Sequence, residues 1–149
     1  MEIVKLNTND VTYFKDLVVI FKEVFENDNH IVHDEHLKKL LFNPNFLVFV
    51  VLIDNKVVGG LTVYILQQYY TTKPVAYIYD VGIAPKFQRQ GLGKALIAEV
   101  CKFCKTHEFE DAYVEAESDD IDAVNFYRKT NFSYEINATH FTYSISNEK

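Results

Sequence analysis

A short stretch in the middle of the chain limits the fold most tightly. Residues Val75 to Ile83 have the apolar and aromatic character of a strand, and the pattern Gln88-x-x-Gly91-x-Gly93 follows, just before residues with helical apolar spacing. Glycine has no Cβ, so it permits backbone conformations that turn several N–H groups toward one point. Such a nest at the N-terminus of a helix binds phosphate. The stretch therefore predicts a strand, a phosphate-binding turn and a helix in succession.

This turn has three competing interpretations: a turn without a ligand, a dinucleotide site and a P-loop. A dinucleotide site requires G-x-G-x-x-G and a following parallel strand with an acidic residue, and a P-loop requires Gly-Lys-Ser/Thr. The sequence contains neither pattern. Arg89 and Lys94 place positive charge beside the turn. We therefore predict that the turn binds a pyrophosphate, and the molecule that carries this pyrophosphate is still open.

The remaining segments predict one α+β domain over residues 1–149. A chain of 149 residues is long enough for a domain with its own core. The runs Phe46–Ile53, Val57–Gln68 and Val75–Ile83 predict an antiparallel meander, because a turn and a loop separate them. The other expected elements are a strand at Glu2–Leu6, a helix at Val11–Phe25, a short helix around Leu37–Leu41, a helix after Gly93, a strand at Ala112–Glu117, a helix ending near Thr130 and a closing hairpin at Phe132–Ile136 and His140–Ile145.

The charge balance restricts the partners. Lys plus Arg number 15 and Asp plus Glu number 21, which gives a formal net charge of −6. A negative surface argues against nucleic acid and suits a small cationic molecule. The sequence has no apolar run that could cross a bilayer, and its N-terminus lacks the features of a signal peptide, so we expect a cytoplasmic protein without membrane contact. The oligomeric state stays open, with a homodimer among the alternatives.

Two clusters of potential metal ligands have simpler explanations. Cys101 and Cys104 form a lone C-x-x-C inside a predicted helix, without further ligands at zinc spacing, so we interpret them as buried or half-buried thiols. His30, His33 and His36 recur every three residues, which leaves metal binding as an alternative. The first two precede the next predicted helix and need not share a face with the third. We predict a surface loop that shapes a substrate pocket, and no metal site.

Three segments carry a family resemblance. The turn Gln88–Gly93 resembles the Q/R-x-x-G-x-G/A loop that binds the pyrophosphate of acetyl-CoA in GCN5-related N-acetyltransferases. The segment Val81–Pro85 resembles the central strand of that family, and Ala123–Phe132 resembles its A-x-x-x-Y-x-K-x-G-F segment. The order of elements is similar throughout. Asn131 stands where the family usually has glycine, and Asp120 where many members have asparagine.

A closer resemblance is to the aminoglycoside 3-N-acetyltransferases of the gentamicin type. It rests on Tyr77–Asp80, Val114–Glu117 and the pattern Ala123-Val124-x-x-Tyr127. It implies acetyl transfer from acetyl-CoA to a primary amine of a small polycationic acceptor, by direct attack. The alternatives are the same chemistry on a polyamine, an amino acid, a peptide or a protein, and a CoA-binding module without turnover.

The resemblance also implies which residues bind acetyl-CoA. The sheet would be mixed and mostly antiparallel, with two central strands splayed apart so that Val81 and Ile83 pair with the pantetheine arm. A backbone N–H near Val81 or Gly82 would stabilise the oxyanion. Tyr127 would protonate the leaving thiolate, with a core aromatic as the alternative. The expected cofactor-binding residues are Val81, Gly82, Ile83, Gln88, Arg89, Gln90, Gly91, Leu92, Gly93 and Lys94.

Asp80 is a carboxylate within an apolar, aromatic strand. An unpaired charge buried there would be costly, whereas a carboxylate facing a wet cleft could bind an ammonium group and accept its proton. The alternative is a structural carboxylate with a nearby donor. Strand alternation predicts that Asp80 shares a face with Ala76 and Ile78, and that Val81 shares the opposite face with Tyr79.

Two glutamates on the next predicted strand could add negative charge to the acceptor pocket. Glu115 and Glu117 alternate in register, so they would lie on the same face. Several carboxylates around a cleft suit a polycationic acceptor, because each desolvated contact with an ammonium group is a charge-assisted hydrogen bond. A solvated surface position is the alternative for both.

Overall fold

The computed structural model describes residues 1–146 and separates them into two compact units, residues 1–115 and the part of 116–149 that it describes. The first unit contains β1 (Glu2–Lys5), α1 (Val11–Val24), α2 (Asp34–Phe42), β2 (Phe46–Ile53), β3 (Lys56–Leu66), β4 (Val75–Ile83), the short 3-10 turn η1 (Pro85–Phe87), α3 (Leu92–Thr106) and β5 (Asp111–Val114). The second unit contains α4 (Ile121–Arg128).

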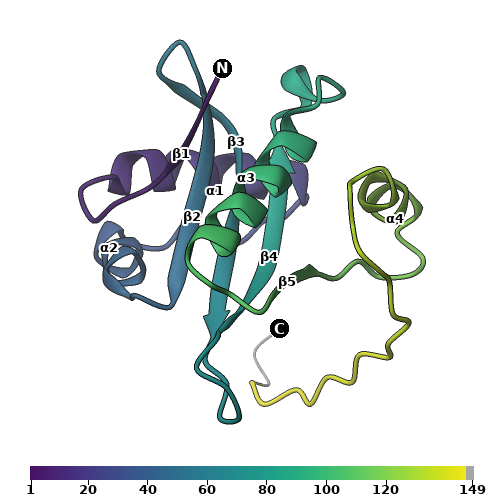
Figure 1. The fold of residues 1–149 in the computed structure, drawn as a ribbon. Helices are drawn as coiled ribbons and strands as arrows, with labels where there is room; N and C mark the ends of the chain where they lie inside the picture. The colour runs from purple at the N-terminus through teal and green to yellow at the C-terminus, as the bar shows by residue number, and fades with distance from the viewer. Residues whose placement is uncertain (147–149) are drawn as a thin grey trace. The chain divides into compact units, whose positions relative to one another are not determined.

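The first unit is built on a five-stranded sheet in the order β1-β2-β3-β4-β5. Neighbouring strands are antiparallel except β4 and β5, which are parallel, so the predicted mixed sheet of an α+β fold is confirmed. One core cluster packs α1 and α2 on one face, and another packs α3 on the opposite face (Figure 1). Strand β2 is almost wholly apolar because helices cover it on both sides.

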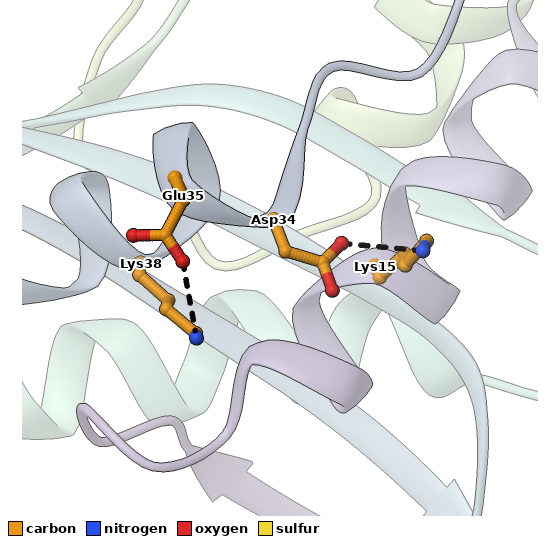
Figure 2. Close-up of polar contacts among 4 residues, drawn as sticks. All are labelled: Lys15, Asp34, Glu35 and Lys38. Carbon is orange, nitrogen blue, oxygen red and sulfur yellow. Dashed lines mark hydrogen bonds and ion pairs between the residues drawn. The ribbon is translucent and has the colours of Figure 1, made fainter.

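The two helices on the α1 face are also joined by charge. Lys15 of α1 forms an ion pair with Asp34, the first residue of α2, at 3.2 Å, and Lys38 pairs with Glu35 within α2 at 3.4 Å (Figure 2). Both pairs are partly exposed, so each adds little stability. The Lys15–Asp34 pair nevertheless brings the start of α2 to α1, and thereby closes the connecting segment of residues 25–33 into a loop beside the sheet.

A β-bulge divides β4 into two halves. Leu61 pairs with Val81 and Val63 pairs with Ile78, so Thr62 alone lies opposite Tyr79 and Asp80. An extra residue reverses the alternation of side chains beyond it. The predicted faces of Asp80 and Val81 were therefore wrong.

The corrected arrangement is visible in the packing. Val81 packs with Ala76 and Ile78 in the core cluster under α3. Asp80 lies with Tyr79 on the α1 face, where both line a pocket. The bulge thus keeps an apolar side chain in the core and turns the carboxylate away from it.

Strands β4 and β5 diverge as predicted. Their pairing begins at Val75 with Asp111 and ends at Ile78 with Val114. Strand β4 continues to Ile83 and still pairs with β3 there. The edge of β4 beyond Ile78 is therefore not paired with β5. Strand β5 is shorter than predicted, and it ends before Glu115 and Glu117.

In the second unit, Asp120 caps α4 by accepting a hydrogen bond from the Ala123 N–H at 3.2 Å.

The predicted closing hairpin is wrong for this structure, because residues 131–146 contain no strand. Alternation indicates which face of a strand is apolar, but a strand also needs a partner edge, which local pattern does not supply. The apolar side chains of the segment are exposed: Phe132, Tyr134, Ile136, Phe141, Tyr143 and Ile145.

Candidate active site

A pocket of about 300 Å³ opens on the α1 face of the sheet. Its walls come from α1, the 25–33 segment, α2 and strands β2 to β4. Its aromatic lining consists of Phe14, Phe21, Phe25, Phe46, Tyr64 and Tyr79. Its polar lining consists of Lys22, Asn27, Asn29, His30, His36, Thr62 and Asp80. A mostly apolar cavity with a few converging polar groups is the usual form of a small-molecule site.

Asp80 is the carboxylate of this pocket. Burial raises the pKa of the Asp80 carboxyl above its ordinary value. Within residues 1–146 no basic side chain forms an ion pair with it, Lys22 included. The structural alternative for Asp80, a carboxylate with a nearby donor, thus has no basic side chain among these residues to supply that donor. An incoming ammonium group would supply the partner that the pocket walls do not.

Thr62 holds the backbone of Asp80 in place. Its side chain is 6% exposed, and its Oγ1 accepts a hydrogen bond from the Asp80 N–H at 3.4 Å. Because the bulge takes this amide out of regular strand pairing, a side-chain acceptor replaces the backbone one. Sequence reasoning missed Thr62, since only the strand register shows that it lies opposite Asp80.

Two phenol rings lie beside Asp80. Tyr64 and Tyr79 contact each other edge to face, with ring centroids 5.3 Å apart. Burial, followed by the nearby Tyr79 and Asp80, raises the pKa of Tyr64. The Tyr64 hydroxyl therefore stays neutral and can donate or accept a hydrogen bond. Neither ring was predicted for the site. Both residues alternate with core residues along their strands, and the sequence alone does not show whether such an aromatic residue lines a pocket or packs in the core.

The histidine segment lies where the loop prediction put it. His30 and His36 line the pocket together with the loop residues between Asn27 and Val32, while His33 occupies the N-cap position of α2. Within residues 1–146 no three or more His, Cys, Asp or Glu side chains are grouped as metal ligands. The prediction of buried or half-buried thiols is confirmed for Cys104, which is buried, and is wrong for Cys101, which is exposed. Burial, with Cys101 nearby, raises the pKa of Cys104 to about 11, so that thiol is protonated at neutral pH.

The glycine turn at the start of α3 has backbone conformations that are compatible with the predicted nest. Arg89 and Gly91 both have left-handed backbone conformations, with φ of 63° and 82°. Gly91 is the N-cap residue, and Ala95 donates the first helical hydrogen bond, to the Gly91 carbonyl at 3.0 Å. The N–H groups of residues 92–94 therefore have no acceptor within the helix. Apart from Gly91 and its two neighbours in the chain, no residue has an atom within 4 Å of where a Gly91 Cβ would stand, so a phosphate has room to approach.

Members of the turn contribute in different ways. Leu92 and Gly93 are buried and anchor the start of α3 in the core. The side-chain Nε2 of Gln88 donates to the Ile83 carbonyl at 2.9 Å, so this side chain ties the loop to the end of β4. The Gln88 amide is thus engaged within the chain, whereas the N–H groups of residues 92–94 have no acceptor within the helix.

Glycine is also required where α1 crosses the end of β4. A Cβ at Gly82 would stand 2.9 Å from the Phe21 ring. The side of Gly82 that faces α1 is thus filled by Phe21, and the free strand edge from Tyr79 to Ile83 lies on the side that β5 has left. The fold therefore leaves this edge of β4 unpaired with β5 next to the pocket that holds Asp80, with the Ile83 carbonyl already bonded to Gln88.

The remaining predicted residues fall into both units. Glu115, in the first unit, is exposed and accepts a hydrogen bond from the Tyr77 hydroxyl at 2.9 Å. Glu117 and Tyr127 belong to the second unit, where the Tyr127 ring contacts Phe126 with centroids 4.9 Å apart. The roles of Glu117 and Tyr127 stay predictions.

Comparison with known proteins matches this arrangement to one family. The model of the acetyltransferase (GNAT) family matches residues 14–132. The aminoglycoside acetyltransferase meta-AAC0020 from an uncultured soil metagenomic sample, solved in complex with sisomicin, is 44% identical, covers 97% of this chain and 96% of its own, and superposes with a TM-score of 0.95.

Two further structures share the fold. The aminoglycoside acetyltransferase HMB0005, also from an uncultured soil metagenomic sample, is 24% identical with a TM-score of 0.87, and covers 97% of this chain and 98% of its own. The aminoglycoside N-acetyltransferase AAC(6')-Iy in complex with CoA is 14% identical with a TM-score of 0.78, and covers 95% of this chain and 93% of its own.

Among the described residues, no helix is long and apolar enough to cross a membrane.

Proposed function

Because the chain belongs to the acetyltransferase (GNAT) family and is an acetyl-CoA-dependent N-acetyltransferase, we propose that it acetylates a primary amine of an aminoglycoside. The observation that carries this proposal is Asp80, a carboxylate in a largely aromatic pocket that forms no ion pair with a basic side chain of residues 1–146. Such a pocket attracts an ammonium group and accepts its proton. The 44% identity to an aminoglycoside acetyltransferase solved with sisomicin supports the acceptor class.

We assign the donor side of the reaction to the turn and to the free edge of β4. The left-handed Arg89 and Gly91, with the N–H groups of residues 92–94 and the charge of Lys94, bind the pyrophosphate of acetyl-CoA. Backbone groups of residues 81–83 bind the pantetheine arm, and one of their N–H groups stabilises the oxyanion. Acetyl-CoA supplies the thioester carbonyl that the amine attacks.

We assign proton transfer to two side chains. Asp80 binds the ammonium group, accepts its proton directly or through water, and so frees the lone pair for direct attack. Tyr127 donates a proton to the departing thiolate, as the family resemblance implies, since its ordinary pKa of about 10 suits that role. Glu115 and Glu117 attract the other amines of the acceptor, and the 3-N amine is the proposed site of acetylation.

These roles require both units to act as one catalytic domain of residues 1–149. The family match from 14 to 132 runs across the boundary after Glu115, which supports this proposal.

The test is incubation with acetyl-CoA and a panel of gentamicin-class aminoglycosides, with release of CoA as the readout and NMR of the product for the position. We expect CoA release and one acetylated nitrogen, at position 3. No turnover of any aminoglycoside would reject the acceptor, and parallel reactions with polyamines, amino acids and peptides would then identify another amine. Stabilisation by CoA without turnover of any amine would instead indicate a binding module.

A further inference from the structure

A row of aromatic rings leaves the pocket and crosses the sheet to its last strand. The rings of Tyr64 and Tyr79 have centroids 5.3 Å apart, and those of Tyr79 and Tyr77 are 5.7 Å apart. The rings of Tyr77 and Tyr113 stack at 4.8 Å with an angle of 11° between their planes. These four residues, the tyrosine row, connect β3, β4 and β5 on one face.

The tyrosine row is accessible and continuous with the pocket. Tyr64 and Tyr79 line the pocket itself. Tyr79 is 54% exposed, and Tyr64 and Tyr113 are each 39% exposed. Exposed aromatic rings that form one surface, rather than scattered single residues, are typical of a binding site. The pocket therefore does not end at Asp80, because its aromatic floor extends toward β5.

A carboxylate lies at each end of this floor. Asp80 lies at the pocket end, and Glu115 lies just after β5, on the same face as Tyr113 by strand alternation. The Tyr77 hydroxyl donates to Glu115 Oε1 at 2.9 Å, which fixes the direction of that side chain. Within residues 1–146 no basic side chain forms an ion pair with Glu115. The floor thus has negative charge at both ends and neutral rings between them.

We propose that the tyrosine row and Glu115 form a second acceptor subsite, which binds a ring and an ammonium group of the aminoglycoside that are not acetylated. This inference rests on the proposed function. The C–H faces of sugar-like rings pack on tyrosine rings, and the phenol hydroxyls hydrogen-bond to their hydroxyl groups. An ammonium group near a ring face gains a cation–π contact, and the Glu115 carboxylate gives it a charge-assisted hydrogen bond. A single-ring amine in the pocket would not reach this subsite.

The test compares two acceptors of different length. Sisomicin has several rings, and 2-deoxystreptamine has one. The kcat/KM of each is measured for the wild type, Glu115→Gln, Tyr113→Leu and Tyr113→Phe. Glu99→Gln is the matched control, because it also removes one carboxylate charge but lies on α3, on the opposite face of the sheet.

We expect Glu115→Gln and Tyr113→Leu to lower the ratio of sisomicin to 2-deoxystreptamine kcat/KM about three- to tenfold, chiefly through the KM of sisomicin, as for the loss of one exposed charge-assisted contact. Tyr113→Phe, which keeps the ring, should retain most of the ratio. Glu99→Gln should match the wild type. Equal ratios for Glu115→Gln and the wild type would overturn the subsite.

Calorimetric titration of each protein with sisomicin, without acetyl-CoA, separates the two proposals. Turnover of sisomicin without any difference between variants would leave the function standing and reject the subsite. Sisomicin binding that weakens in Glu115→Gln but not in Glu99→Gln, without turnover, would reject the function and support the subsite. Absence of both binding and turnover would reject both.

Discussion

At the scale of single residues, Asp80 combines the charge that we propose for proton transfer with an environment that is unfavourable for it. Burial raises its pKa, which means that the ionised form is less stable in the folded protein than in the unfolded chain. A catalytic base benefits from such a shift, because a higher pKa brings its proton affinity closer to the value that suits a general base near neutral pH. The same shift removes stability from the free protein, which gives a test with two independent readouts.

Asp80→Asn should therefore lose activity and gain stability. We expect kcat/KM to fall by about 100-fold or more, as for the loss of a general base. The folded pKa exceeds the ordinary value of 3.8, so the wild type loses stability as the pH rises through the interval between the two values, whereas asparagine does not titrate. Thermal unfolding at pH 7 should show a higher Tm for Asp80→Asn, with a difference that shrinks as the pH is lowered toward 3.8.

The control is Asp54→Asn, in the turn between β2 and β3, where asparagine tolerates the same left-handed backbone. It should leave activity unchanged. A normal kcat/KM for Asp80→Asn would remove Asp80 from the mechanism, and an unchanged Tm would show that its charge is solvated.

Thr62 gives a second test at this scale. Thr62→Val keeps the side-chain shape but removes the acceptor of the Asp80 N–H, which lies 3.4 Å away. We expect a loss of about 1 kcal/mol of unfolding free energy and a several-fold lower kcat/KM, because the bulge no longer fixes Asp80. Affinity for CoA, measured by calorimetry, should not change. Thr62→Ser should restore kcat/KM; if it does not, the hydroxyl has no positioning role.

At the scale of elements, the turn before α3 was predictable and the bulge in β4 was not. The glycine spacing describes a local backbone conformation, and Arg89 and Gly91 adopt it. The bulge depends on how β3 registers against β4, so alternation within β4 alone put Asp80 and Val81 on the wrong faces. The same limit applies to residues 132–145, whose alternation predicted a hairpin that the structure lacks. The local backbone conformation of the turn could thus be predicted from the sequence, whereas the pairing of one segment with another could not be predicted as well.

The N-terminus of α3 offers a sharp comparison between Gly91→Asp and Gly91→Asn. Both side chains have nearly the same size and tolerate a φ of 82°, and the Cβ of each would have no atom within 4 Å from residues other than its chain neighbours. Only aspartate places a negative charge where the pyrophosphate is proposed to bind. We expect Gly91→Asp to bind CoA at least about tenfold more weakly than Gly91→Asn in calorimetric titration, a difference of about 1.4 kcal/mol. Equal affinities would put the pyrophosphate elsewhere.

At the scale of the whole molecule, the proposed reaction divides its groups between two units. Asp80, the turn before α3 and the tyrosine row belong to residues 1–115, whereas Tyr127 and Glu117 follow that boundary. Sequence order and motif spacing predicted these residues as members of one site, because a family resemblance carries the arrangement that local physics does not supply. If Tyr127 is to protonate the thiolate, the two units have to fold and act as one body.

Cooperative unfolding tests that requirement. The chain contains no Trp, so a single introduced tryptophan reports on its own surroundings. Tyr13→Trp on α1 and Phe126→Trp on α4 would each replace a half-buried aromatic residue, one in each unit. If residues 1–149 form one domain, the two fluorescence transitions in urea should have the same midpoint and slope, and saturating CoA should shift both equally. Separate midpoints, or a shift by CoA in the Tyr13→Trp protein alone, would show that the units unfold independently and would remove the support for Tyr127 as the acid of this reaction.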